Sequence, residues 1–318
     1  MSFLEFDCSD RTFEEIQIFA GFQDSNLEML NKCFKSVFMI RDQRIKVEVN
    51  DTLDTHKVEE VIDACFSIID TQHRLNSQDV NYICSLAFKN RLKDFKAHQL
   101  QAVCKTKTGK MIYPKTIGQA ILCDAMRHNE IVFATGVAGT GKTYLAVAYA
   151  VNMLKSERVE KIILTRPAVE AGESLGFLPG DMKEKVDPYL RPLYDALNEM
   201  LGLETVEKYV EKQVIEIAPL AFMRGRTLND AVVILDEAQN ATCAQMKMFL
   251  TRMGKNCKMV VTGDVTQTDL IKKKDSGLMQ ACTILDHIDG ISIIHLENSD
   301  VVRNPLVQKI IERYAKVE

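Results

Sequence analysis

One eight-residue segment combines the residue types and the spacing that bind a nucleoside triphosphate. It reads Gly136-Val137-Ala138-Gly139-Thr140-Gly141-Lys142-Thr143. The glycines let the backbone turn tightly, so that its N–H groups converge on phosphate oxygens at the positive end of a following helix. Lys142 can reach the β- and γ-phosphates, and Thr143 can place its hydroxyl on a magnesium ion. The segment therefore predicts a binding site for ATP and magnesium.

An acidic pair follows an apolar run about a hundred positions further along the chain. Val232-Val233-Ile234-Leu235 predicts a buried strand, and Asp236 and Glu237 stand at its carboxyl end. Asp236 is expected to hold the magnesium ion through water, and Glu237 to polarise the attacking water as a general base. A base beside the magnesium carboxylate favours hydrolysis, whereas a P-loop kinase must exclude water. We therefore predict an ATPase, with a small-molecule kinase as a weak alternative.

A further polar group is predicted at the end of another strand. Val260-Val261-Thr262 is followed by Gly263-Asp264 and, three residues later, by Gln267. Gln267 is expected to hydrogen-bond the γ-phosphate or the attacking water. The alternative is an ordinary capped turn between a strand and a helix.

The elements that must position these residues follow an α/β pattern. From Ile117 onward, short apolar runs alternate with helical stretches, which is typical of a parallel sheet covered by helices. We predict a RecA-like P-loop NTPase fold in which a helix from Thr143 to Leu154 follows the glycine-rich segment. The predicted strands are Ile131–Thr135, Lys161–Thr165, Val214–Ile217, Ala231–Leu235, Lys258–Thr262 and Ile291–Leu296.

A small α+β domain is predicted ahead of this sheet. Residues 12–21 are expected to form a strand, and Asn26 to Phe34 a short helix. Two more strands are predicted at Val37–Ile40 and Ile45–Val49, joined by a tight turn at Asp42-Gln43. Two longer helices are expected to follow, one capped by Asp54 and one running from Ser77, as its cap, to Asn90.

Charge divides the chain into three parts. Residues 1–70 hold 15 acidic and 7 basic side chains, a balance of −8, and residues 71–116 have a balance of +7. Residues 117–318 are nearly neutral at −3. We predict a small domain over residues 1–92, a basic connector over 93–116 and an ATPase domain over 117–318. The connector lysines are predicted to meet RNA phosphates, with a solvated linker as the alternative.

Composition excludes several classes of protein. No apolar run approaches the ~20 residues that span a bilayer. The first residues are acidic where a signal peptide would be basic. The nine cysteines are odd in number and include no Cys-x-x-Cys pair, so neither a disulfide framework nor a zinc site is indicated. We expect a cytoplasmic protein with reduced thiols and no membrane partner.

The motifs fall in the order of the first motor domain of superfamily 1 helicases, and they resemble the PhoH family of ATPases more closely. The resemblance covers about Pro114 to the end. It is carried by Leu164-Thr165-Arg166-Pro167-Ala168-Val169-Glu170-Ala171-Gly172-Glu173, Gly176-Phe177-Leu178-Pro179-Gly180-Asp181, Met223-Arg224-Gly225-Arg226-Thr227-Leu228, Asp236-Glu237-Ala238-Gln239 and Asp300-Val301-Val302-Arg303-x-Pro305.

This resemblance implies further roles for single residues. Gln119 is similar to the glutamine that reads adenine in superfamily 1, since a side-chain amide can both donate to and accept from the base. Arg166 matches the motif that grips a single-stranded backbone, and Arg303 resembles the arginine that reaches the γ-phosphate.

Two departures from the helicase pattern shape the expected assembly. Only about 50 residues follow Gly263-Asp264, too few for a second motor domain, so a neighbouring subunit of a homo-oligomeric ring is expected to supply an arginine. Arg226 and Arg252 are the candidates. The N-terminal unit is similar to a KH-type RNA-binding fold, but it has no Gly-x-x-Gly loop and a charge of −8 over residues 1–70.

Two functional hypotheses follow. The first is an ATP-driven motor or remodeller of single-stranded RNA, stimulated by that RNA. The alternative is a nucleotide-dependent switch whose ATP state recruits a protein partner, such as an RNA-processing nuclease. For the acidic N-terminal unit, docking of a protein partner is the alternative to RNA binding.

Overall fold

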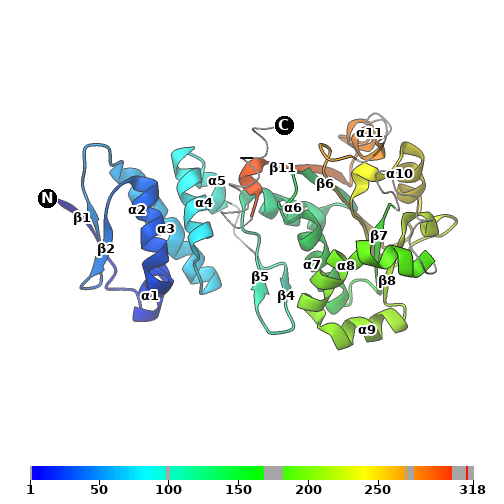
Figure 1. Ribbon diagram of the computed structural model, residues 1–318, viewed down its shortest axis with the longest axis horizontal. Coiled ribbons are helices and arrows are strands. Elements are labelled where there is room, and N and C mark those ends of the chain that lie inside the picture. Colours follow the sequence, from blue (N-terminus) through cyan, green and yellow to red (C-terminus); the bar gives the residue numbers. More distant parts are fainter. Residues whose placement is uncertain are drawn as a thin grey trace. The chain divides into compact units, whose positions relative to one another are not determined.

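The computed structural model of the chain describes residues 2–97, 101–167, 182–268, 270, 276–302 and 313. The chain divides into two compact units, Met1–Leu100 and Gln101–Glu318. Each unit has its own sheet, shown in Figure 1 with its helices.

The first unit is a small α+β domain, as predicted. Its three-stranded antiparallel sheet has the order β1-β3-β2. Asp42 and Gln43 both have a positive φ, 52° and 54°, which confirms the tight turn between β2 and β3. The strands are β1 (Phe3–Asp7), β2 (Phe38–Arg41) and β3 (Arg44–Glu48), and the helices are α1 (Phe13–Ala20), η1 (Phe22–Asp24), α2 (Ser25–Phe34), α3 (Thr55–Gln72), α4 (Ser77–Phe88) and α5 (Leu92–Ala97).

Two local predictions for this unit are wrong. Residues 13–20 form helix α1 and not a strand, because Thr12 and Glu15 make a reciprocal capping box that starts a helix. Ile16 and Phe19, three positions apart, then share the buried face of that helix. Helix α4 is capped by Asn76 and not by Ser77, since the Asn76 side chain accepts from the N–H groups of Gln78 and Asp79. The predicted cap of α3, Asp54, is confirmed.

The second unit is a RecA-like α/β domain with a six-stranded parallel sheet, as predicted. The strand order is β11-β6-β10-β9-β7-β8. All six predicted strands are confirmed, two with the predicted bounds and four with ends shifted by a residue or two. The strands are β6 (Ile131–Gly136), β7 (Lys161–Arg166), β8 (Ile215–Pro219), β9 (Ala231–Leu235), β10 (Lys258–Gly263) and β11 (Ile291–Leu296).

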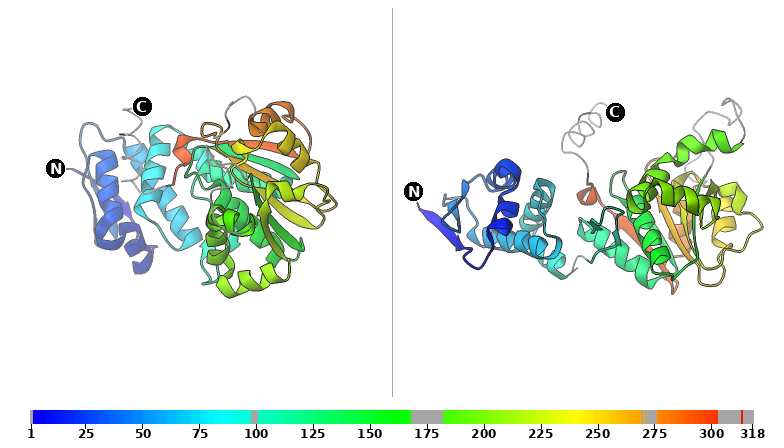
Figure 2. Two further views of the ribbon diagram at one scale, coloured as in Figure 1. Left: turned by 45° about the vertical axis from the view of Figure 1, so that its right-hand side comes forward. Right: turned by 90° about the horizontal axis from the view of Figure 1, so that it is seen from below.

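Helices cover both faces of this sheet, because successive strand residues point to opposite sides. Val232 and Ile234 of β9 pack in one core with residues of the first helical layer, whereas Val233 and Leu235 pack in another with the second layer. Figure 2 shows the sheet between the layers. The first layer holds α6 (Ile117–His128), α7 (Lys142–Lys155), α8 (Met182–Leu201) and α9 (Leu203–Glu211), and the second holds α10 (Cys243–Leu250) and α11 (Gly277–Ile284).

A two-stranded hairpin lies within the range predicted as a basic connector. It consists of β4 (Cys104–Lys105) and β5 (Met111–Ile112). The ammonium of Lys155, at the end of α7, donates to the carbonyl oxygens of Lys105 (2.7 Å) and Met200 (3.0 Å). The hairpin is therefore fastened to the rest of the second unit by the same helix that begins at the glycine-rich segment.

Three observations concern membrane spans, disulfides and metal sites. No helix in the described part of the chain has both the length and the apolarity needed to cross a bilayer. None of the nine cysteines forms a disulfide, and six of them are buried. Over the same described residues, no three His, Cys, Asp or Glu side chains gather as a metal site.

Candidate nucleotide-binding site

The glycine-rich segment forms a loop between β6 and α7. A side chain at Gly136 would place its Cβ 2.3 Å from the carbonyl oxygen of Leu296 in the neighbouring strand β11, so only glycine fits. Gly141 has φ of 80° and stands at the start of α7. The loop therefore wraps around the positive end of a 14-residue helix, where N–H groups attract an anion.

Two side chains that follow the last glycine have distinct surroundings. Lys142 is 8% exposed, and its ammonium donates to the carbonyl oxygens of Gly136 (2.7 Å) and Val137 (2.9 Å). The Thr143 hydroxyl donates to Asp236 Oδ1 at 2.6 Å. The loop thus places one cation at its centre and one hydroxyl against the predicted magnesium carboxylate.

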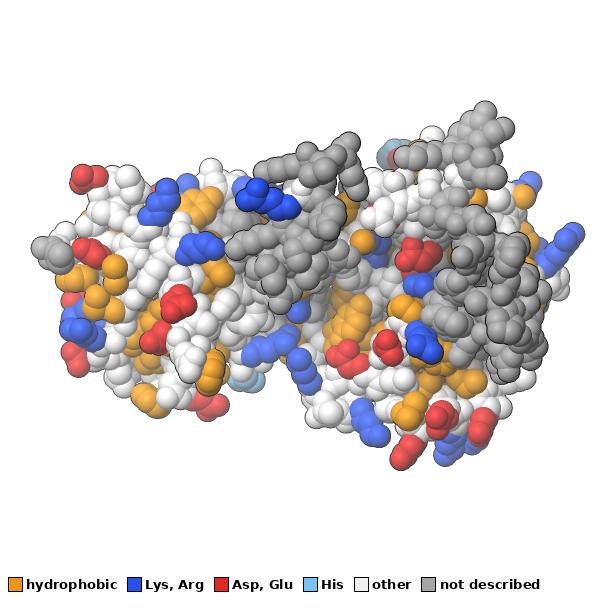
Figure 3. Space-filling view, in the orientation of Figure 1, with side chains coloured by type: hydrophobic (Ala, Val, Ile, Leu, Met, Phe, Trp, Pro, Cys, Tyr) orange, Lys and Arg blue, Asp and Glu red, His pale blue; other side chains and the backbone are white. Residues whose placement is uncertain are grey.

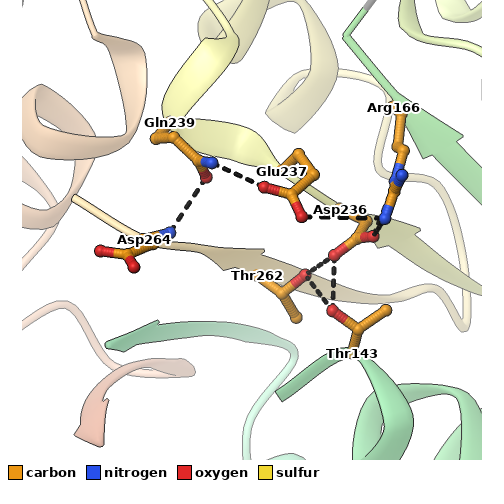
Figure 4. Close-up of polar contacts among 7 residues, drawn as sticks. All are labelled: Thr143, Arg166, Asp236, Glu237, Gln239, Thr262 and Asp264. Atoms are coloured by element: carbon orange, nitrogen blue, oxygen red, sulfur yellow. Dashed lines mark hydrogen bonds and ion pairs between the residues drawn. The ribbon is translucent and has the colours of Figure 1, made fainter. Parts of the chain in front are cut away.

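Asp236 is held at both carboxylate oxygens. It is 1% exposed. Its Oδ1 accepts from the hydroxyls of Thr143 and Thr262, each at 2.6 Å, and its Oδ2 accepts from Arg166 Nε at 2.8 Å and from Arg166 Nη2 (Figure 4). The strand ends of β7, β9 and β10 meet at this carboxylate.

Glu237 is held by a glutamine from its own motif. Gln239 Nε2 donates to Glu237 Oε2 at 2.6 Å, and Gln239 Oε1 accepts from the backbone N–H of Asp264 at 3.0 Å (Figure 4). Gln239 is 2% exposed, whereas the Glu237 side chain is 48% exposed. Gln239 therefore links the base expected from the sequence to the end of β10. The Asp-Glu-Ala-Gln motif marks Gln239 in the sequence, but only the fold shows that it contacts Glu237 and the N–H of Asp264.

A cavity of about 250 Å³ brings the predicted residues together. The predicted residues in its lining are Ala138, Gly139, Gly141, Lys142, Thr143, Asp236, Glu237 and Gln267. Asp264 also lines it, and Asp264 Oδ2 has no hydrogen-bond partner among the described residues although it is buried. Magnesium in a P-loop site takes a Ser/Thr hydroxyl and an Asp carboxylate together with phosphate oxygens and water. Thr143 and Asp236 fit that donor set.

Gln119 lies against the loop and not in the cavity lining. It is 4% exposed, its Oε1 accepts from the N–H of Lys115 at 2.7 Å, and its Nε2 donates to the carbonyl oxygen of Thr140 at 3.0 Å. Both ends of its amide are used by the backbone. Its adenine-reading role stays a prediction, and it requires these bonds to change when a base binds.

The segment after β11 reaches the same loop. Asp300 accepts from the N–H of Gly118, and the N–H of Val302 donates to the carbonyl oxygen of Gly139 at 3.0 Å. Arg303, the next residue, lies outside the described residues. Its predicted contact with the γ-phosphate stays a prediction.

Both arginines expected to act across subunits have partners within the chain. Arg226 makes two bonds to the carboxylate of Glu216, at 2.6 and 2.7 Å, which raise the pKa of its guanidinium. Arg252 donates to the carbonyl oxygens of Met248 and Arg226. Either side chain must leave these partners to serve a neighbouring subunit.

Comparison with known proteins identifies the family. The model of the "PhoH-like protein" family matches residues 111–315. The chain is 52% identical over 303 residues to a PhoH-like protein of Bacillus subtilis, covering 95% of this chain and 94% of the relative. It is 47% identical to a PhoH-like protein of Mycobacterium leprae, covering 94% and 85% of the two chains.

More distant matches cover less of the chain. Protein PhoH of Escherichia coli is 46% identical over 193 residues, which are 60% of this chain and 54% of that protein. Among solved structures, a SWI2/SNF2 ATPase core of Sulfolobus solfataricus in complex with dsDNA has a TM-score of 0.36 at 12% identity, covering 57% of this chain and 37% of that one. A score this low carries no argument about function. On the family match and the near full-length relatives, this chain belongs to the PhoH-like protein family.

Proposed function

We propose that this chain hydrolyses ATP with magnesium and acts as an RNA-stimulated motor or remodeller of single-stranded RNA. The observation that supports hydrolysis is the contact between Thr143 of the glycine-rich loop and Asp236, with Glu237 beside it at the cavity. A hydroxyl and a carboxylate at this spacing suit a P-loop magnesium site, and the adjacent carboxylate suits activation of water.

The chain's own side chains supply binding and proton transfer. The loop N–H groups and Lys142 would hold the phosphates, and Thr143 with Asp236 would hold magnesium, which when bound would neutralise charge on the phosphates. Glu237 takes the proton of the attacking water, and Gln239 keeps its carboxylate oriented. Gln267 lines the same cavity and helps to position the water or the γ-phosphate.

The hairpin β4–β5 supports the RNA part of the proposal. Lys105, Lys107 and Lys110 are exposed on it, and Lys155 fastens it to the ATPase unit. On the face of that unit shown in Figure 3, acidic and basic side chains are interspersed. A local group of lysines on a fixed hairpin suits a sequence-independent contact with a phosphate backbone.

A homo-oligomeric ring completes the proposal. A cation on the far side of the γ-phosphate typically accelerates this chemistry by ~10³-fold or more. A head-to-tail interface would present the same arginine to every neighbouring site. Mixing Lys142→Ala subunits with Arg252→Ala or Arg226→Ala subunits tests this sharing, since activity should return in a mixture if either arginine acts across the interface.

The deciding experiment is an ATPase assay with and without single-stranded RNA, run alongside a native mass measurement. Turnover that rises with RNA supports the motor. Turnover indifferent to RNA favours the alternative, a nucleotide-dependent switch. The alternative is supported by the balance of −8 over residues 1–70, which repels phosphate and suits docking of a protein partner such as an RNA-processing nuclease.

A further inference from the structure

The carboxylate of Asp236 is divided between two kinds of partner. Its Oδ1 faces the hydroxyls of Thr143 and Thr262, while its Oδ2 accepts from both Nε and Nη2 of Arg166 (Figure 4). The Arg166 side chain is 16% exposed and that of Asp236 is 2% exposed. The pair is therefore a nearly buried, forked ion pair, and its carboxylate, Asp236, lines the nucleotide cavity.

Asp236 needs a cationic partner inside the folded chain. An ionised carboxylate with so little exposure is costly unless it is paired and hydrogen-bonded. Lys142 is another cation near the loop, and its ammonium donates to the carbonyls of Gly136 and Val137 and to the Thr140 hydroxyl. The charge on Asp236 is compensated by Arg166.

The same guanidinium also approaches the general base. Arg166 Nη2 lies 3.8 Å from Glu237 Oε1, and Gln239 holds the other oxygen of that carboxylate. The register of β7 and β9 sets this geometry, because the N–H of Asp236 donates to the carbonyl oxygen of Thr165 at 2.9 Å. Arg166, the next residue of β7, is thereby placed beside both acidic side chains.

We propose that Arg166 is a positioning residue of the nucleotide site, and that its main role is to fix Asp236 and Glu237 and not to grip RNA. By occupying Oδ2, Arg166 leaves Oδ1, on the Thr143 side, as the oxygen that serves the metal. A planar fork is required, since the point charge of a lysine cannot bond Oδ2 twice while reaching Glu237. This inference rests on the proposed magnesium-dependent ATPase.

The test measures metal affinity directly. Binding of Mn²⁺, the probe for the site, is followed by electron paramagnetic resonance in the presence of ADP, for the full chain and for Arg166→Ala, Arg166→Lys and, as a matched control, the exposed Arg158→Ala. Arg166→Ala should weaken Mn²⁺ binding by about 10- to 100-fold, as is usual for a residue that orients a metal ligand. The Mn²⁺ affinity of Arg166→Lys should lie between those of Arg166→Ala and the native chain, and Arg158→Ala should bind Mn²⁺ as the native chain does.

Two further measurements separate this role from a structural or RNA-binding one. Affinity for ADP in EDTA and affinity for single-stranded RNA should stay within about twofold of native in Arg166→Lys. If Arg166→Ala is unstable because Asp236 is left unpaired, the double variant Arg166→Ala/Asp236→Asn should recover the melting temperature. Native Mn²⁺ affinity together with lost RNA affinity in the Arg166 variants would overturn the inference. Absence of magnesium-dependent turnover in the native chain would instead refute the proposed function.

Discussion

Gln239 offers a quantitative test of how Glu237, the proposed general base, is held. Replacing it with leucine removes the 2.6 Å bond to Glu237 Oε2 and leaves the N–H of Asp264 without its acceptor. A hydrogen bond to a charged group contributes about 1.5–3 kcal/mol. If the full loss raises the activation free energy, turnover should fall about 10- to 150-fold. The unpaired N–H should cost a further 1–3 kcal/mol, roughly, in the free energy of unfolding.

Gln239→Glu separates these two effects. It keeps an acceptor for the N–H of Asp264, so the cost of an unpaired N–H is avoided. It also places a second carboxylate against Glu237. Two carboxylates at such a short distance share a proton, so Glu237 is no longer a free base. Turnover should fall although the N–H of Asp264 keeps its acceptor, and any loss of melting temperature should come from the buried second carboxyl.

A double-mutant cycle with Glu237→Gln completes the test. Phosphate release and nucleotide affinity would be measured for both single variants and the double variant. If Gln239 acts through Glu237, adding Gln239→Leu to Glu237→Gln should cost little more turnover. Fully additive losses would show that Gln239 has a separate role, and native turnover in Gln239→Leu would refute the reasoning.

The remaining predictions concern the loop, the hairpin and stability at high pH. Lys142→Ala should lose tight ATP binding, whereas Glu237→Gln should keep it and slow phosphate release by about a hundredfold; near-native release from Glu237→Gln would reject the base assignment. Neutralising Lys105, Lys107 and Lys110 together should weaken RNA binding and flatten its dependence on salt, while neutralising the exposed Lys208, Lys212 and Lys255 should not; an unchanged slope would place the hairpin away from RNA. Burial raises the pKa of Cys123 from 9.0 to about 12, so its contribution to stability is present below pH 9 and is lost as pH rises towards 12. Melting temperatures should accordingly fall less steeply over that interval in Cys123→Ala than in the native chain.

Much of the second unit can be predicted from its sequence, because its signals are local. Strand β9 is apolar at all five positions and buried on both faces, which only a central parallel strand requires. Gly136 to Thr143 is contiguous, so its loop shape depends on its own glycines and on the two elements that flank it. Local signals also mislead where they compete: apolar residues at 13, 16, 18 and 19 suit a strand or a helix, and the capping box at Thr12 decides for the helix.

The amino-acid sequence by itself therefore determined the order of the strands along the chain in the second unit and which motifs stand at their ends. Only the tertiary structure decided which side chains meet there, because those contacts join residues far apart in the chain. Arg166 and Asp236 are 70 positions apart. The strand order places β7 beside β9, and the pairing of these two strands fixes their register. Gln239 meets Asp264 for the same reason, through β9 and β10. Hydrogen-bond geometry depends on such register to within a fraction of an ångström, and no pattern of residue types along the chain carries that information.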